Sequence, residues 1–243
     1  MAGPIGIRFL RSCFPNSHVL QSRTFFKALV LSLTFLAYCT YHLSRRPLSV
    51  VKSVLNQNCS ILVPPPGTVI TNETINTWCD WAPFDGKNAN SLLGFMDSCY
   101  LFSYAFFMFF SGFLAERCNL RYFLALGMIL SGIFTYLFGV AFYEGIHSIW
   151  YFAAIQVVGG ALQTTGWPAT VACVAHWFPP KSSRGLIFGV WNSHTNLGNI
   201  LGAAIAGAFV ETNWGLSFMV PGIIIAVTGF FLFIFLAPCE YMN

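Results

Sequence analysis

The stretch FFKALVLSLTFLAYCTYHLSRRP, residues 25–47, sets two adjacent arginines at the end of a long apolar run. A run of about 20 apolar residues can cross the hydrocarbon core of a bilayer as a helix. Charged side chains within such a segment are costly and are usually kept for a function. The stretch therefore predicts a membrane helix that carries a cationic site near its end.

Helical spacing gathers the polar side chains of this region on one face. Steps of three and four residues place on one stripe Thr34, Tyr38, Tyr41, Arg45, Ser49 and Lys52. Arg46 is rotated about 100° away from this stripe. A polar stripe that ends in cations indicates a helix lining a water-filled cavity that receives an anion. The alternative is that both arginines reach the far membrane interface, because residues 26–45 already span about 30 Å.

The composition agrees with a membrane protein. Only 8% of the residues are charged and 56% are hydrophobic, whereas a soluble domain carries about 25% charged residues. Six segments qualify as spans: residues 25–55, 92–114, 122–142, 149–177, 185–210 and 214–238. The sequence therefore predicts an all-α membrane protein with six transmembrane helices, in which residues 25–238 form the membrane domain.

Several function classes lack support in the sequence. No cluster of Lys and Arg indicates nucleic-acid binding. The eight cysteines show no metal-ligand spacing, so neither a metal nor a cofactor is expected. The long loop holds no acid/base or nucleophile constellation, so we expect no enzyme. No cleaved signal peptide is predicted, and the first membrane helix would serve as the targeting anchor.

Prolines and glycines predict how the helices bend and pack. Pro47 and Pro168 each remove a helix hydrogen bond and should kink their helices. Glycines four residues apart allow helices to approach closely. This spacing occurs at Gly185 and Gly189 and again at Gly198 and Gly202.

Basic and acidic connections alternate along the chain. The basic ones contain Arg8, Arg11, Arg23 and Lys27, then Arg117 and Arg121, then Lys181 and Arg184. The others hold mostly acids, namely Glu73, Asp80 and Asp85 against Lys87, then Glu144, then Glu211. Because basic loops stay in the cytosol, residues 1–24 and the tail 239–243 are predicted to be cytosolic.

The loop of residues 56–90 is therefore placed on the lumenal side. It contains two glycosylation sequons, at Asn58 and Asn72. It also holds Cys59 and Cys79, which would pair as a disulfide in an oxidising lumen or else stay free thiols. Spacing alone leaves both possibilities open.

A charged motif follows the second predicted helix. Its members are Gly112, Glu116, Arg117 and Arg121. A small residue, an acid and two bases at a cytosolic helix end would form a charge cluster that locks two helices. The motif resembles the signature of the major facilitator superfamily, although Asn119 replaces the usual second glycine. The alternative is an ordinary solvated loop.

Further motifs resemble the organophosphate:phosphate antiporter branch of that superfamily, and within it the sugar-phosphate exchangers (solute carrier 37, or glucose-6-phosphate exchanger, family). They are QTTGWP at 163–168, HWF at 176–178, Arg184-Gly185 and WNSHTNLG at 191–198. The resemblance covers residues 25–238. It implies exchange of a phosphorylated sugar for inorganic phosphate by alternating access, in the endoplasmic reticulum membrane. It also implies a fold of two six-helix halves, each built from two inverted three-helix repeats.

Phosphate chemistry and the resemblance together suggest the site residues. Arg45 matches the first-helix arginine of the family, and its planar fork suits a phosphate group. Lys52 would draw anions toward the entrance. The other expected substrate-binding residues are Tyr41, Asn192 and Thr195, and the further candidates are Arg46, His194, Gln163 and Trp167.

Some of these assignments have alternatives. Asn192 and Asn199 share a helix face and would either read sugar hydroxyls or join helices. Bacterial glycerol-phosphate relatives carry a histidine at the position of Thr195 and a lysine at that of Met108. His194 therefore points about 100° off the matched face and would be either a packing residue or a ligand. Asp97 would be a polar cap or a pore residue.

The resemblance covers one half of a transporter, since the sequence stops soon after the sixth predicted helix. We expect a truncated N-terminal half that does not exchange phosphate by itself, because half of the cavity wall is missing. Self-association, or pairing with a second transporter half, would rebuild that wall. The alternative function is a non-transporting form that associates with or regulates a full-length transporter.

Overall fold

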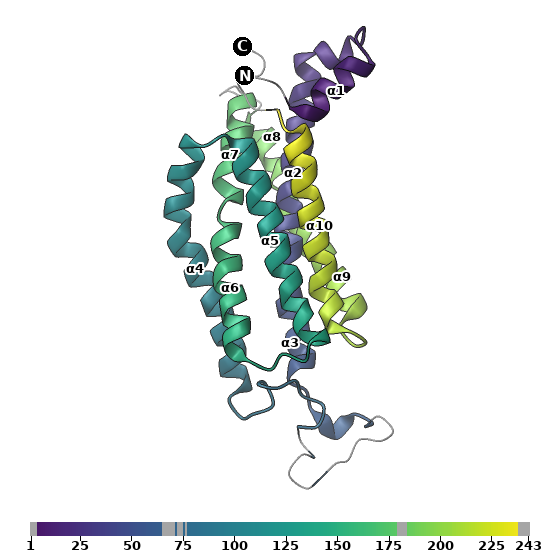
Figure 1. Cartoon of the computed structure of the whole chain (residues 1–243), viewed down its shortest axis with the longest axis vertical. Coiled ribbons are helices and arrows are strands. Elements are labelled where there is room, and N and C mark those ends of the chain that lie inside the picture. Colours follow the sequence, from purple (N-terminus) through teal and green to yellow (C-terminus); the bar gives the residue numbers. More distant parts are fainter. Residues whose placement is uncertain (1–3, 65–70, 72–74, 76, 179–183, 238–243) are drawn as a thin grey trace.

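The computed structural model describes residues 4–64, 71, 75, 77–178 and 184–237. Within these residues the chain is helical and contains no strand, which confirms the predicted all-α class. The long helices run side by side along one axis (Figure 1). The long loop between the first two spans lies at one end of the bundle, and the short helix α1 (Ile5–Cys13) lies at the other.

Four continuous stretches of helix are long and apolar enough to cross a bilayer. They are Arg23–Leu55, which comprises α2 (Arg23–Arg45) and α3 (Pro47–Leu55), then α4 (Ala89–Arg117), α5 (Leu120–Tyr143) and α10 (Trp214–Phe235). The remaining two predicted spans are each divided into two helices, α6 (Ile149–Gln163) with α7 (Gly166–Trp177) and α8 (Arg184–Trp191) with α9 (His194–Phe209). The chain is a multi-pass membrane protein, and the count of six spans stays a prediction.

The predicted interruptions at proline occur, and each proline begins a new helical segment. Pro47 is the first residue of α3, directly after the break at Arg46. Pro168 lies in the first turn of α7, after the break at Thr164 and Thr165. The first turn of a helix tolerates proline because its N–H groups have no partner within the helix. Both breaks therefore divide a span without leaving a lost hydrogen bond inside either segment.

Glycines control the closest helix contacts. Gly198 and Gly202 lie directly on the backbone of α2, as their spacing predicts. The expectation for Gly185 and Gly189 was wrong, since each has open space where a side chain would stand. The spacing of a glycine pair does not reveal whether a neighbouring helix covers that face.

The tightest contact in the bundle joins α5 to α10, and the sequence did not reveal it. Gly132 and Gly139 on α5 face the backbone of Gly222 and Gly215 on α10, and each pair is reciprocal. Both pairs recur at seven-residue spacing, which keeps them on one face of each helix. Without Cβ atoms, the two backbones approach closely enough for dispersion to hold the helices together in lipid.

The connections follow the predicted alternation of ends. The α4–α5 connection lies at the same end as α1, whereas the α5–α6 and α9–α10 connections lie at the end of the long loop (Figure 1). The basic residues of α1 and of the α4–α5 connection therefore share one end of the bundle, and the acids of the α5–α6 and α9–α10 connections, Glu144 and Glu211, lie at the opposite end. Glu73 and Lys181 lie outside the described residues. Which end faces the cytosol stays a prediction.

Replacement of Gly198 by alanine tests the packing of α9 on α2. The added methyl group would strike the backbone carbonyl of Cys39, and such overpacking lowers the free energy of unfolding by about 1–3 kcal/mol. The control is Gly207→Ala on the same helix, where the space is open and alanine's higher helix propensity should leave stability unchanged or slightly raised. Thermal unfolding of the purified variants in detergent measures both, and equal midpoints would contradict the packing argument.

Candidate functional site

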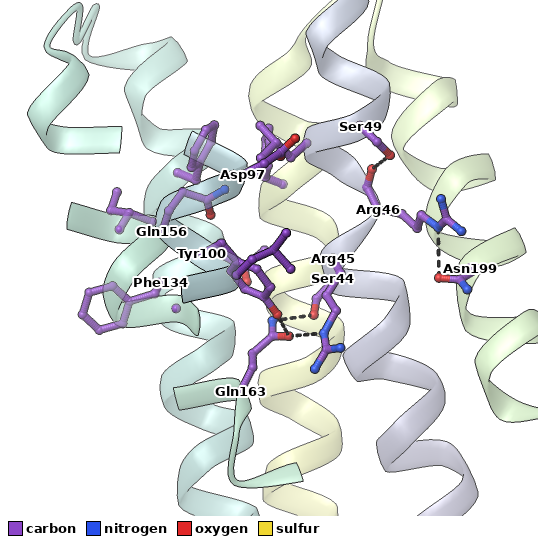
Figure 2. Close-up of a pocket in the computed structure, with 17 residues that line it drawn as sticks. Ser44, Arg45, Arg46, Ser49, Asp97, Tyr100, Phe134, Gln156, Gln163 and Asn199 are labelled. Atoms are coloured by element: carbon purple, nitrogen blue, oxygen red, sulfur yellow. Dashed lines mark hydrogen bonds between the residues drawn. The ribbon is translucent and has the colours of Figure 1, made fainter. Parts of the chain in front are cut away.

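A cavity of about 370 Å³ opens between the helices on the polar side of the α2–α3 break. We call it the arginine cavity. Its polar lining comes from five spans: Ser44, Arg45, Arg46 and Ser49 on α2–α3, Asp97 and Tyr100 on α4, Thr135 on α5, Gln156 and Gln163 on α6, and Asn199 on α9. Leu48, Leu101, Phe134, Phe138, Ile155, Gly159 and Phe218 complete the wall. Figure 2 shows the two arginines pointing toward different helices.

Gln163 holds Arg45 in place. The Nε of Arg45 donates a hydrogen bond of 2.6 Å to Oε1 of Gln163, and the hydroxyl of Tyr100 donates to the same oxygen at 2.7 Å. The amide nitrogen of Gln163 in turn donates to Oγ of Ser44 at 3.2 Å. Gln163 is buried at the last position of α6, where the helix breaks. The amide of Gln163 on α6 therefore bonds to residues of both α2 and α4 (Figure 2).

The positive charge of Arg45 has no carboxylate partner among the described residues. Its guanidinium carbon lies 4.8 Å from the centroid of the Tyr104 ring, and its Nη2 is buried without a hydrogen-bond partner. A buried donor that lacks a partner costs about 1–3 kcal/mol, and more when it is charged. An anion bound in the cavity would supply both the missing acceptor and the missing charge.

Arg46 has a different partner. It lies at the break between α2 and α3, is exposed, and donates from Nε to Oδ1 of Asn199 at 2.9 Å. Both arginines line the cavity, although they point toward different helices. Asn199 thus joins α9 to the α2–α3 break, in agreement with the alternative that this asparagine connects helices. Its amide also lines the cavity.

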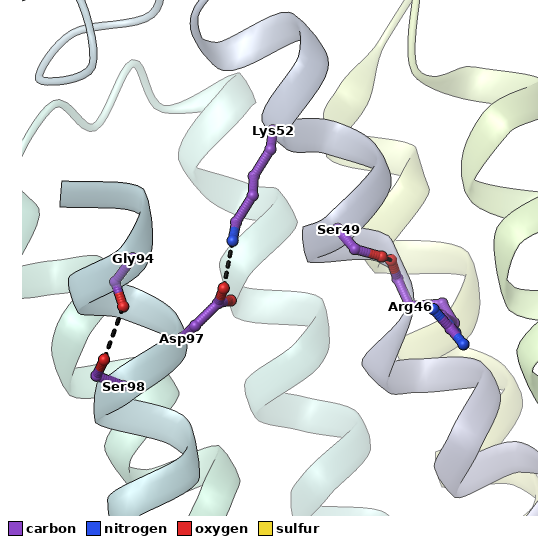
Figure 3. A network of polar contacts seen from close by, with 6 residues as sticks. All are labelled: Arg46, Ser49, Lys52, Gly94, Asp97 and Ser98. Atoms are coloured by element: carbon purple, nitrogen blue, oxygen red, sulfur yellow. Dashed lines mark hydrogen bonds and ion pairs between the residues drawn. The ribbon is translucent and has the colours of Figure 1, made fainter. Parts of the chain in front are cut away.

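An ion pair joins Lys52 of α3 to Asp97 of α4 beside the cavity (Figure 3). Asp97 lines the cavity from inside α4 and does not cap the helix, and a role in a transport pathway stays a prediction. The side chains of Lys52 and Asp97 are 27% and 46% exposed. Because Asp97 is neutralised by Lys52, the charges of Arg45 and Arg46 dominate the cavity.

Besides Lys52, five expected site residues lie outside the arginine cavity. Tyr41 is fully buried and shares a hydrogen bond of 3.0 Å with Thr165, because α7 covers its face of α2. His194 is fully buried among aromatic rings, 4.5 Å from Trp191 and 4.7 Å from Tyr38 between centroids, which fits the packing alternative.

The other three lie near this aromatic cluster or at the surface. Thr195 Oγ1 lies 3.2 Å from Nδ1 of His194, and Trp167 packs against Tyr38. Asn192 is exposed and does not line the cavity. Helical phase and the family resemblance assigned these residues to the pathway, but the packing of α7 and α9 on α2 covers Tyr41 and His194, and Asn192 faces the surface.

Among the polar cavity residues, the sequence analysis missed Ser44, Tyr100, Thr135 and Gln156. Tyr100 lies three residues after Asp97, so both share a face of α4, and that spacing was visible in the sequence. Gln156 lies seven residues before Gln163 on the same face of α6. Ser44 gave no such signal, because its role depends on a partner on another helix.

A sequence model of the Major Facilitator Superfamily matches residues 25–241. The chain belongs to this superfamily. Its relatives include the glucose-6-phosphate exchanger SLC37A2 of Danio rerio, 57% identical over 230 residues that cover 93% of this chain and 46% of the relative. SLC37A2 of Homo sapiens is 54% identical over 88% of this chain and 42% of its own length.

A second exchanger of the same kind is more distant. The glucose-6-phosphate exchanger SLC37A1 of Homo sapiens is 44% identical over 96% of this chain and 44% of its own length. The chain therefore spans less than half the length of each of these relatives.

The superfamily motif borders a second cavity of about 780 Å³ at the α4–α5 connection, lined by Gly112, Glu116 and Arg121 among others. Arg121 is buried and donates from Nη2 to the hydroxyl of Tyr122 at 2.7 Å. The guanidinium of Arg117 lies 3.8 Å from the ring centroid of Phe113. In the described part of the chain, no ion pair joins Glu116 to either arginine. The helix-locking role of this motif stays a prediction.

The long loop carries the other predicted features. Cys59 and Cys79 form a disulfide in the structure, with Cα atoms 5.5 Å apart. Asn58 is exposed, and its Oδ1 accepts hydrogen bonds from the N–H and the hydroxyl of Ser60. The second sequon, at Asn72, lies outside the described residues.

Replacement of Gln163 by leucine tests the anchoring of Arg45. It would leave Arg45 Nε and the Tyr100 hydroxyl without their shared acceptor, so we expect the free energy of unfolding to fall by about 1–3 kcal/mol. Gln156→Leu is the control, because Gln156 lines the same cavity from the same helix but makes no side-chain hydrogen bond within the described residues. Chemical or thermal unfolding in detergent compares them. If Gln156→Leu proves as destabilising as Gln163→Leu, the shared acceptor is not what matters.

The disulfide gives a chemical prediction. In protein from microsomes, Cys59 and Cys79 should resist alkylation until a reductant is added, whereas the exposed thiol of Cys118 should react at once. Closing a loop of this length stabilises the fold by about 3 kcal/mol in the chain-entropy model. Mass spectrometry of peptides alkylated before and after reduction decides the question. Alkylation of both cysteines without reductant would show free thiols.

Proposed function

We propose that the chain contributes the phosphate-binding half of a sugar-phosphate transporter, and that the anion is held in the arginine cavity. The observation that carries this proposal is the guanidinium of Arg45, which lines the cavity, lacks a carboxylate partner and keeps a buried donor unused. A phosphate group offers the acceptors and the negative charge that such a guanidinium needs.

The electrostatics of the cavity suit a dianion. Arg45 and Arg46 contribute two positive charges, and the charge of Asp97 is balanced by Lys52. A volume of about 370 Å³ lies within the usual range for a small-molecule site. A phosphate monoester would place its phosphate group at the arginines and its sugar toward the amides of Gln156 and Asn199.

The relatives support the substrate class. Those proteins are named glucose-6-phosphate exchangers, and we propose a phosphorylated sugar as substrate here, with inorganic phosphate as the counter-substrate. We further propose six crossings arranged as two inverted three-helix repeats. A second half, from a longer form or from another copy, would complete the cavity wall. No observation favours a regulatory chain that does not transport, and we do not propose one.

The proposed membrane is that of the endoplasmic reticulum, with the end of the bundle that carries α1 in the cytosol. The basic residues of α1 and of the α4–α5 connection lie at that end, in agreement with the positive-inside rule. The long loop would then face the lumen, where an oxidising environment supports its disulfide and where Asn58 and Asn72 can receive glycans.

Glycosylation tests this orientation. We expect the chain from cells to gain mobility on treatment with a glycosidase, and Asn58→Gln combined with Asn72→Gln to abolish that shift. Each single variant serves as the control for the other sequon. An unchanged mobility, together with an N-terminus protected from protease in intact microsomes, would place the loop in the cytosol instead.

A pair of conservative substitutions tests the site. Arg45→Lys keeps the charge but loses the planar fork and the contact with Gln163, so we expect binding of inorganic phosphate to weaken about ten- to a hundredfold, equivalent to about 1.5–3 kcal/mol. Arg46→Lys should have a smaller effect, because an exposed cation tolerates the exchange.

Equilibrium binding of radiolabelled phosphate and glucose 6-phosphate to the purified chain in nanodiscs measures the two variants. If Arg46→Lys is the crippling change and Arg45→Lys is near normal, the assignment of Arg45 is wrong. If the unsubstituted chain binds neither ligand, the proposed function itself fails.

A further inference from the structure

The helix α1 has a sequence pattern that the transport proposal does not use. Its residues, IGIRFLRSC, include two arginines, and the first acidic residue of the whole chain is Glu73. The sequence analysis treated residues 1–24 only as a cytosolic segment and predicted no helix there. The structure gives this segment a defined place on the bundle.

One face of α1 is anchored to the membrane domain. Gly6 and Ile7 are buried, and a side chain at Gly6 would strike Ile234 and Phe235 at the end of α10. Arg11 fixes the following turn, because its guanidinium donates to the carbonyl of Leu20 from both Nε and Nη2 and lies 5.5 Å from the ring centroid of Phe26. The position of α1 beside α2 and α10 is therefore set by specific contacts (Figure 1).

A second face of α1 is apolar and uncovered. Ile5 is 54% exposed and Phe9 is 67% exposed, and the two lie about 40° apart around the helix axis. Phe14 and Val19, just beyond the helix, are also exposed. Large apolar side chains gathered on one face in this way indicate a surface that meets a partner or a membrane.

The third face carries charge. Arg8 is exposed and lies about 100° from Phe9 around the axis, on the side away from the bundle contacts. No ion pair involves Arg8 within the described residues. A short helix with one bundle-facing side, one exposed apolar side and one arginine side has the pattern of a helix that lies in a membrane interface.

The surroundings of α1 identify the partner. The end of α10 that Gly6 contacts, at Ile234 and Phe235, also carries exposed phenylalanines one turn earlier, Phe230 and Phe231, on a helix long and apolar enough to span the bilayer. Arg23 and Lys27 add positive charge at the adjoining start of α2, with no acid nearby in the sequence. This surface is complementary to negatively charged headgroups above an apolar layer.

We propose that α1 is an interfacial helix that inserts Ile5 and Phe9 into the leaflet next to the end of α10 and gathers anionic phospholipids through Arg8. The proposal depends only on the chain being a membrane protein, and not on what it transports. The strength with which α1 binds the membrane would then depend on the fraction of anionic lipid in that leaflet.

Fluorescence quenching in vesicles tests the proposal with the full chain. An environment-sensitive fluorophore is attached at Phe9→Cys, or at Arg8→Cys as the matched control, after the accessible free thiols Cys13, Cys99 and Cys118 have been replaced by serine. The Phe9 probe should be quenched by lipid brominated near the headgroup and shielded from aqueous iodide, and the Arg8 probe should show the reverse. If Phe9→Cys does not fold, the fluorophore is attached at Ile5→Cys instead, because Ile5 lies on the same face of α1.

Lipid selectivity is measured with the Phe9 probe by placing bromine on phosphatidylglycerol or on phosphatidylcholine at equal mole fraction. We expect about a fivefold preference for the anionic lipid, lost in Arg8→Gln. Equal quenching by the two lipids would overturn the anionic preference. Equal iodide access at both positions would overturn docking on lipid, and a Phe9 probe shielded from both iodide and lipid would show that protein, such as a second copy, covers the face.

Discussion

The bond between Arg45 and Gln163 is the constraint on which the rest of the site depends. A guanidinium in the middle of a membrane bundle is tolerated only if its donors are satisfied and its charge has a purpose. Gln163 supplies one acceptor and, by bonding Tyr100 and Ser44 as well, fixes the helices around it. The donor that remains unused, Nη2, and the missing carboxylate are the features on which the proposed anion site depends.

Two helix breaks lie beside this arrangement. At the first break, adjacent arginines line one cavity while bonding to different helices, Arg45 to α6 and Arg46 to α9. The second break follows Gln163, so α6 ends at the residue whose amide accepts the hydrogen bond from Arg45. In both cases proline falls in the first turn of the next segment, so the interruption leaves no unsatisfied N–H inside a helix.

Packing by glycine explains how so many aromatic helices form a compact bundle around a polar space. The reciprocal contacts of Gly132 with Gly222 and of Gly139 with Gly215 bring α5 and α10 together, while Gly198 and Gly202 bring α9 onto α2. Close backbone contact replaces the hydrophobic effect, which does not drive helix association in lipid. At the edge of the bundle, α4 exposes a face rich in phenylalanine. The exposed Ile5 and Phe9 of α1 are apolar in the same way, which agrees with the proposal that α1 contacts lipid.

The sequence by itself determined the helical membrane class, the interruptions at Pro47 and Pro168, the alternation of basic and acidic connections, and the place of Arg45 on a polar stripe. These features follow from local periodicity, chain composition and the cost of charge in lipid. Only the tertiary structure decided which polar residues share a cavity. Arg45 and Tyr41 lie on one predicted stripe, yet α7 covers Tyr41, and Gln163 reaches Arg45 from 118 positions away. Periodicity defines the faces of each helix, but in a membrane both lipid and protein accept apolar faces, so only the packing of neighbouring helices decides which face is covered.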